Sequence, residues 1–280
     1  MKKTIGSLML VAALLLCVQS ALAQDYKGAP KPTIQDYGPF TNVKPAHNNH
    51  TPQQSGTCGN PASNCLFYGG DFENNPVGPE IANGLSNGTT TLVSGSPYGS
   101  ATFVPFTVPK GQAWLVTGLF TNNFSSYGVL DQAPNQPTSA AYWEIDEDIL
   151  PGNAGTTVAS GTSAATANPT GRSAFLLNEY TIQVTGLSVT LTAGSYWLAV
   201  VPLCTNTGDP YCGGVFFLSD ADYINTAPKN AFGPAEPTDL SYFNSPYFDY
   251  TYGPTNGPLG ACVGLGCDAF SAGVLGRAGK

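Results

Sequence analysis

The densest group of charged side chains lies in YWEIDEDILPGNAG, the segment that runs from Tyr142 to Gly155. Charged residues make up 10% of the chain, yet four of the five positions from 144 to 148 are acidic. Carboxylates at this spacing suit an acid–base pair, a calcium site, or the solvated face of a strand that runs into a turn. The elements that position these acids decide among the three.

On a β-strand, alternate side chains of this segment point to opposite faces. One face would carry Tyr142, Glu144, Asp146 and Asp148, and the other Trp143, Ile145, Glu147 and Ile149. We therefore expect Trp143 and Ile145 to anchor the core. We expect the acids of the first set to face solvent, where charged side chains discourage pairing of strand edges.

The calcium alternative would use Asp146, Asp148 and Asn153, together with carbonyl groups of the turn. The spacing differs from an EF-hand loop, so the site would be irregular, and calcium is the one cofactor that the residues suggest. Glycoside hydrolysis would need Glu144 and Asp146, which strand geometry places roughly 7 Å apart. The sequence offers no cleft and no cause for a raised carboxyl pKa, so no catalytic residue is predicted.

A second concentration of functional side chains is LSYFNSPYFDYTYGP, residues 240–254. Tyrosine rings with polar tips suit stacking on a sugar or contact with another protein. The alternative is an aromatic loop that folds over the core. The candidate ligand-binding residues are Tyr242, Tyr247, Tyr250 and Tyr252, and the partners they predict are a polysaccharide or a cell-surface protein.

The sequence lacks the residues that other catalytic arrangements need. The only histidines, His47 and His50, lie in a polar segment rich in Pro and Asn, so neither a Ser-His-Asp triad nor a metal site has a rigid frame there. We therefore predict a protein that is not an enzyme.

Six cysteines remain once Cys17 is removed with the signal segment described below, and an even number in an exported chain is typical of disulfides. They fall into three close pairs: Cys58 with Cys65, Cys204 with Cys212, and Cys262 with Cys267. Three local disulfides are the first expectation, although six cysteines permit other pairings. Zinc is the alternative, but the spacings lack the two-residue separation of a zinc knuckle.

The first 23 residues have the layout of a secretory signal peptide. Lys2 and Lys3 precede the apolar residues 8–18, and Ala21-Leu22-Ala23 forms a small-x-small cleavage site. Cys17 would allow a lipoprotein, but Leu16 stands where a small residue is needed. No later stretch is long and apolar enough to span a membrane, so the sequence predicts a secreted, extracellular or periplasmic protein cleaved near Ala23.

Charge and composition limit the partners further. Removal of the two lysines leaves eight basic and eighteen acidic residues, a formal charge of −10. Without clustered Lys or Arg, the chain lacks the means to bind phosphate backbones, so no nucleic acid partner is expected. Abundant Gly, Pro, Ser, Thr and Asn favour turns and strands over helices.

These signals predict an all-β protein, an antiparallel β-sandwich of jelly-roll-like or Ig-like type that is stapled by disulfides. Residues 24–56 would form an extended or disordered leader, residues 57–270 the sandwich domain, and residues 271–280 a flexible tail. Apolar alternation or short apolar runs predict strands at residues 101–108, 114–120, 142–149, 180–185, 187–191, 196–201 and 215–218.

The order of FTVPKGQAWLVTGL, YWEI, PGNAGTTVASG and GLSVTLTAGSYWLAVVP resembles the ectodomains of secreted bacterial β-sandwich proteins of the PEP-CTERM type. The resemblance covers roughly residues 100–220, and the apolar sorting tail of that family is absent. It implies an exported β-sandwich and brings no catalytic residues. The expected function is a non-catalytic extracellular module for binding, adhesion or structure. The alternative is a carbohydrate-binding module with an aromatic platform, assisted by calcium.

Overall fold

The structure is a computed structural model, and it describes Cys58 and residues 64–71, 85–86, 96–125, 140–174, 177–203, 216–219, 241–246, 250–255 and 270–279. In this part of the chain all twelve elements are strands, and every strand pair is antiparallel. They form one sheet in the order β1-β12-β4-β7-β6-β5-β8-β3-β10-β11, with β9 paired to both β2 and β4. No helix among the described residues has the length and apolar character needed to cross a membrane.

The strands have the following bounds: β1 Cys65–Tyr68, β2 Leu85–Ser86, β3 Ala101–Val108, β4 Ala113–Ser125, β5 Ala140–Glu147, β6 Thr156–Ala174, β7 Leu177–Leu191, β8 Gly194–Leu203, β9 Phe216–Leu218, β10 Tyr242–Ser245, β11 Tyr250–Pro254 and β12 Ala272–Gly279.

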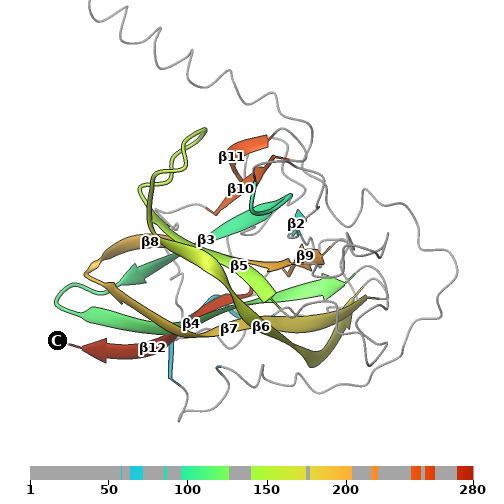
Figure 1. The fold of residues 1–280 in the computed structure, drawn as a ribbon, viewed down its shortest axis with the longest axis horizontal. Coiled ribbons are helices and arrows are strands. Elements are labelled where there is room, and N and C mark those ends of the chain that lie inside the picture. Colours follow the sequence, from blue (N-terminus) through green and yellow to red (C-terminus); the bar gives the residue numbers. More distant parts are fainter. Residues whose placement is uncertain are drawn as a thin grey trace, which may run out of the picture.

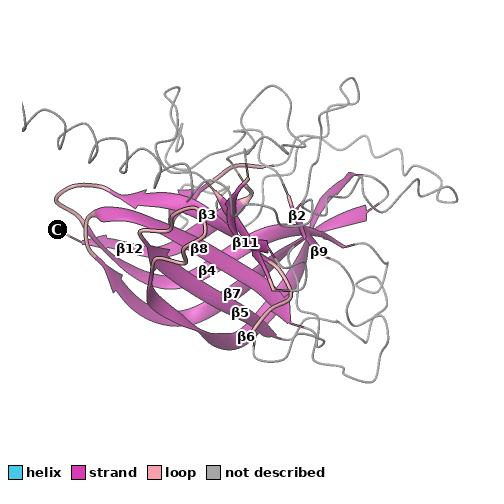
Figure 2. Ribbon diagram, turned by 90° about the horizontal axis from the view of Figure 1, so that it is seen from above, coloured by secondary structure: helices cyan, strands magenta, loops and turns pink. Residues whose placement is uncertain are grey.

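The sheet is strongly curled, and the long strand β6 makes the bend. Its first half pairs with β5, whereas its second half, from Ala165 onward, pairs with β7. As a result β3, β5 and β8 run above β4, β7 and β12 in Figure 1, and the view from above shows the curvature of the strands (Figure 2). The described residues therefore make a half-barrel.

The main core lies on the concave side, between the two arms of this half-barrel. Apolar side chains from β3, β5 and β8 meet others from β4, β7 and β12 there. Phe106 of β3 stacks on Trp114 of β4 with ring centroids 6.1 Å apart. The Thr121 hydroxyl of β4 donates a hydrogen bond to the Val200 carbonyl of β8 across the same space, at 3.0 Å.

The strands with clear apolar alternation were predicted correctly, and the all-β, antiparallel class is confirmed. The two predicted strands at residues 180–185 and 187–191 are one strand, β7, which passes through Gly186 with φ 75°. The finer prediction, a sandwich of jelly-roll-like or Ig-like type, is not confirmed, because β6 joins the two arms into a single sheet.

The flexible tail predicted for residues 271–280 is wrong, because Ala272–Gly279 form β12 between β1 and β4. Its glycines allow the close packing of that position. A Cβ on Gly273 would overlap the Phe120 ring, and one on Gly276 would overlap the Leu115 carbonyl oxygen. Side chains this small do not produce a clear apolar alternation, so the strand was not predicted from the sequence.

Candidate functional site

The acids of β5 lie on the convex face of the sheet, but they are not solvated. Trp143 and Ile145 enter the main core as predicted, and the opposite face carries Glu144 and Asp146. Glu144 is 8% exposed and Asp146 is fully buried. The prediction of a solvent-facing pair is therefore wrong, because a second apolar cluster covers this face of β3, β5 and β8. Its members are Tyr98, Ala101, Phe103, Ile149, Trp197, Ala199, Val201 and Tyr242.

A β-bulge in β6 fixes the surroundings of the two carboxyl groups. Ile145 pairs with Ala159 but Asp146 pairs with Thr157, so Val158 is the extra residue. Bulges re-aim side chains and are frequent beside functional sites. Here the Thr157 hydroxyl donates to Glu144 Oε1 at 2.9 Å, and the Tyr142 hydroxyl donates to Glu144 Oε2 at 3.0 Å.

Three tyrosines gather over the carboxyl pair from separate parts of the chain. The Tyr98 ring lies 5.5 Å from the ring of Tyr142, and its hydroxyl interacts with that of Tyr252. Asn244 ties the group together, since its Nδ2 donates to Tyr98 Oη at 2.9 Å and its Oδ1 accepts from the backbone N–H of Tyr252. We call this group the carboxyl–tyrosine cluster; it comprises Tyr98, Tyr142, Glu144, Asp146, Thr157, Asn244 and Tyr252.

Burial governs the protonation of the cluster. Loss of water around Asp146, reinforced by the neighbouring Glu144 carboxylate, raises the pKa of Asp146 to about 8. Burial likewise raises the pKa of Tyr252 to about 12 and the pKa values of Tyr98 and Tyr142 above the ordinary range. At neutral pH, Asp146 is therefore a neutral acid, and the three phenols keep their protons.

The backbone is strained at two residues in or beside the cluster, one in the turn after β5 and one in β11. Asp148 and Tyr252 adopt positive φ angles of 58° and 37°, which side chains with a Cβ rarely adopt. The Tyr252 carbonyl accepts a hydrogen bond from the Gly152 N–H at 3.2 Å, so β11 is tied to this turn. Such strain tends to persist at functional sites because the surrounding structure enforces it.

Gly155→Ala should destabilise this turn much more than Gly152→Ala. Both glycines have positive φ, 71° and 76°, but only a Cβ on Gly155 would overlap the Glu147 carbonyl oxygen. We expect a loss of about 1 kcal/mol for Gly152→Ala and of about 3 kcal/mol for Gly155→Ala, where overpacking adds to the backbone strain. Urea denaturation of both variants measures the difference, and equal losses would contradict the clash.

The candidate tyrosines take different positions. Tyr242 is buried in the second apolar cluster, in an edge-type contact with Trp197 whose ring centroids lie 6.1 Å apart. Tyr250 is buried in the main core against Phe243. Tyr252 is half-buried beside Phe103 and joins the carboxyl–tyrosine cluster. Tyr247 lies outside the described residues. Of this set, the structure therefore brings Tyr252 to the acids.

The predicted calcium ligands are dispersed between interior and surface. Asp146 is buried, whereas Asp148 and Asn153 are exposed, and Asn153 Oδ1 accepts a hydrogen bond from the Gly155 N–H. Among the described residues, no three His, Cys, Asp or Glu side chains group closely enough to hold a metal ion. This ligand set stays a prediction without support from the geometry.

A buried ion network occupies the convex face of the other arm, and the sequence analysis missed it. The Arg172 guanidinium of β6 lies between two carboxylates, with Nη1 2.7 Å from Asp71 Oδ1 and Nε bonded to Glu179 Oε2. Thr170 donates to the same Glu179 oxygen at 2.7 Å. All three charged residues are at most 9% exposed.

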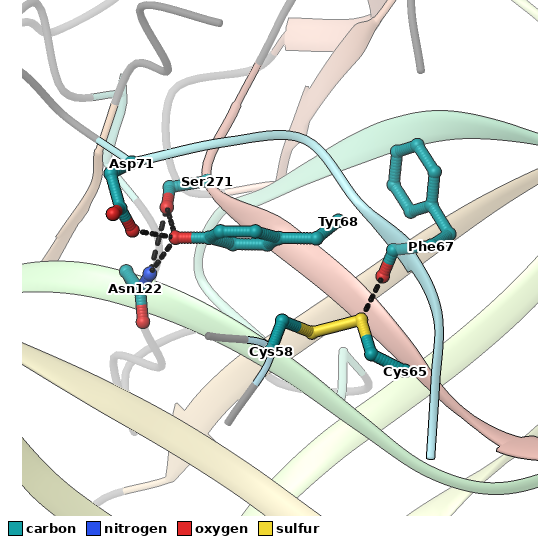
Figure 3. Close-up of a disulfide and its surroundings, with 7 residues drawn as sticks. All are labelled: Cys58, Cys65, Phe67, Tyr68, Asp71, Asn122 and Ser271. Carbon is teal, nitrogen blue, oxygen red and sulfur yellow. Dashed lines mark hydrogen bonds between the residues drawn. A yellow bond between two sulfur atoms is a disulfide. The ribbon is translucent and has the colours of Figure 1, made fainter. Parts of the chain in front are cut away.

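Hydrogen bonds extend this network across four strands (Figure 3). Tyr68 donates to Asp71, and Asn122 Nδ2 donates to Tyr68 Oη at 3.1 Å and to Ser271 Oγ at 2.7 Å. Thr181 of β7 donates to Asn122 Oδ1 at 2.6 Å. These hydrogen bonds connect β1, β4, β7 and Ser271, the residue just before β12, so the network is structural.

One predicted disulfide is confirmed beside this network. Cys58 and Cys65 are bonded, and both pack against Tyr68, Phe120 and Leu275. Figure 3 shows the disulfide at the start of β1, with the Tyr68 side chain extending away from it toward Asp71, Asn122 and Ser271. The other predicted pairs, Cys204 with Cys212 and Cys262 with Cys267, lie outside the described residues.

No family model, curated protein or solved structure matches this chain. Its functional assignment therefore depends on the geometry of its own residues.

The carboxyl–tyrosine cluster is the better candidate for a functional site. Within it, Tyr142 and Tyr252 are half-buried and present ring surface beside the hydrogen-bonding carboxylate of Glu144. Neither carboxylate oxygen of Asp146 has a hydrogen-bond partner. The sequence showed the acidic segment and the aromatic segment of this cluster as two separate features. Tyr98, Thr157 and Asn244 were missed because their roles depend on long-range packing.

Proposed function

We propose that the protein is an exported, non-catalytic binding module that recognises carbohydrate at the carboxyl–tyrosine cluster. The observation that carries the proposal is the juxtaposition of two half-buried rings, Tyr142 and Tyr252, with the Glu144 carboxylate. Rings of this kind stack on the apolar faces of sugars, and carboxylates accept hydrogen bonds from sugar hydroxyl groups. A polysaccharide is therefore the proposed partner.

Export is part of the proposal. The basic, apolar and small-residue segments up to Ala23 support a cleaved signal peptide. The Cys58–Cys65 disulfide fits an oxidising compartment such as the periplasm or the cell exterior. Edges of the sheet could equally serve adhesion between cell-surface proteins, but no side-chain arrangement of the described residues favours a protein partner.

Glycoside hydrolysis is the second candidate, because Asp146, a neutral acid, lies beside a second carboxyl group, that of Glu144. Access argues against it. Asp146, which would be the acid, has no exposed surface. A general acid must reach the leaving-group oxygen of its substrate, so binding is favoured over catalysis.

Affinity electrophoresis of the mature protein through gels containing soluble polysaccharides tests the proposal. We expect at least one polysaccharide to retard the protein, and Tyr142→Ala or Tyr252→Ala to weaken the binding at least tenfold, about 1.4 kcal/mol. Tyr142→Phe keeps the ring and removes the donor to Glu144, so it separates stacking from hydrogen bonding. Arg277→Ala, on the exposed part of β12, is the control that should bind normally.

Two results would count against this function. Equal retardation of the Tyr142→Ala and Tyr252→Ala variants, with unfolding temperatures showing that they are folded, would place any glycan elsewhere. Release of reducing sugar by the wild type, lost in Asp146→Asn, would establish the enzyme instead.

A further inference from the structure

The Asp146 carboxyl group is buried without a counter-charge from the described part of the chain. Its side chain is fully buried, and neither oxygen has a hydrogen-bond donor in bonding geometry. The nearby Thr157 hydroxyl donates instead to Glu144. A buried carboxylate left in this state costs several kcal/mol, so native proteins neutralise such groups with a proton, a basic side chain or a metal ion.

A basic side chain does not supply the missing charge within the described part of the chain. That part contains three Lys or Arg residues. Arg172 is engaged by Asp71 and Glu179 in the buried ion network, and Lys110 and Arg277 are exposed. The groups that face Asp146 are acidic or neutral: Glu144 of β5, Thr157 of β6, Trp197 of β8 and Tyr252 of β11. Tyr98 and Tyr142, which are also neutral, lie beside Glu144.

The chemistry of the site matches a hard cation. Glu144 and Asp146 are close enough to interact directly, and the Thr157 hydroxyl lies against both. Two carboxylates match the charge of a divalent ion, and carboxylate and hydroxyl oxygens are the ligands that calcium takes. Magnesium demands a near-ideal octahedron and keeps several waters, which suits a site under three tyrosines less well.

We propose that Glu144 and Asp146 bind one calcium ion, with the Thr157 hydroxyl as a third ligand group. Calcium competes with a proton for the same buried oxygens. This ligand set differs from the one that the sequence suggested, since it uses Glu144 and Thr157 in place of Asp148 and Asn153. The inference shares its residues with the proposed carbohydrate site, but it does not require a carbohydrate.

Isothermal titration of the metal-free mature protein with calcium chloride tests this inference. At pH 9 we expect one ion per chain. At pH 6 the ion must displace the proton held by Asp146, whose pKa is about 8, so we expect about hundredfold weaker binding. Titrations in buffers of different ionisation enthalpy should show release of about one proton at pH 7.

Variants separate the two ligand sets. Asp146→Asn and Glu144→Gln should abolish binding, and Asp148→Asn and Asn153→Ala should leave it unchanged. Terbium is an independent probe, because Trp197 lies directly across from Asp146 on β8 and can sensitise its luminescence. Trp197→Phe should then reduce the emission without changing the calcium titration.

Absence of binding heat at pH 9 with millimolar calcium would overturn the inference, since the pair would then hold only a proton. Loss of binding in Asp148→Asn would also overturn it in favour of the turn. If polysaccharide still retarded the protein to the same extent after calcium was removed, the carbohydrate function would hold independently of calcium. If the protein bound calcium but no polysaccharide retarded it, the calcium site would hold and the carbohydrate function would fail.

Discussion

Replacement of Asp146 by asparagine is expected to stabilise the metal-free protein at pH 9 and to leave its stability at pH 4 almost unchanged. Asparagine has the shape of the protonated acid and carries no charge. The folded pKa of Asp146 is about 8, against an ordinary value of 3.8. The wild type therefore binds a proton in the folded state that the unfolded chain has already released.

The sign of the effect follows from this difference. Between about pH 4 and pH 8 the folded state binds more protons, so the free energy of unfolding of the wild type falls as pH rises. At about 1.4 kcal/mol per unit, the full loss is on the order of 6 kcal/mol, and it stops growing above the folded pKa. Asp146→Asn lacks this loss, so its advantage should grow from pH 4 to pH 8.

Urea denaturation in EDTA at pH 4, 6, 8 and 9 measures the advantage of Asp146→Asn over the wild type. Asp148→Asn is the matched control, because this exposed acid on the turn should give a difference near zero at every pH. A constant difference between Asp146→Asn and the wild type across this range would mean that the Asp146 pKa is not raised. Saturating calcium should shrink the advantage, since binding stabilises only the wild type.

The second large effect is expected for Arg172→Met. The Arg172 side chain is 7% exposed, and its guanidinium compensates Asp71 and Glu179, which are themselves buried. Removal leaves two carboxylates in the interior without their counter-charge, and breaking a buried pair in this way typically costs about 3–5 kcal/mol. Thermal or urea denaturation at pH 7 should show this loss as a markedly lower midpoint.

A second substitution tests whether charge is the cause. Adding Glu179→Gln to Arg172→Met removes one uncompensated charge, so the double variant should recover part of the stability. Arg277→Met, at an exposed arginine of β12, should change the free energy of unfolding by less than about 0.5 kcal/mol. If the double variant were as unstable as Arg172→Met, the loss would come from packing of the arginine stem instead.

The strands that were predicted correctly are those whose own apolar pattern is clear. β7 and β8 have clean alternation or a continuous apolar run, and both form where expected. β6 was missed, because TTVASGTSAATANPTGRSA has small polar side chains on both faces and obtains its place from pairing with β5 and β7. The same missing strand explains why two stacked sheets were expected in place of one curled sheet.

The candidate site shows a similar limit. A period of two correctly separates Trp143 and Ile145 from Glu144 and Asp146, but it does not reveal what covers each face. The covering residues, Tyr98 and Tyr242 among them, come from distant segments. Arg172 was missed for the same reason, since an isolated charge in a polar segment gives no sign that two acids will enclose it.

The position of β12 has a consequence for the order of folding. This strand, the last described in chain order, lies between β1, the first, and β4. Neither neighbour can complete its backbone pairing until residues 272–279 are available. Contacts over such long sequence separations make folding slow. The nascent chain must therefore remain without its finished sheet until synthesis reaches these residues.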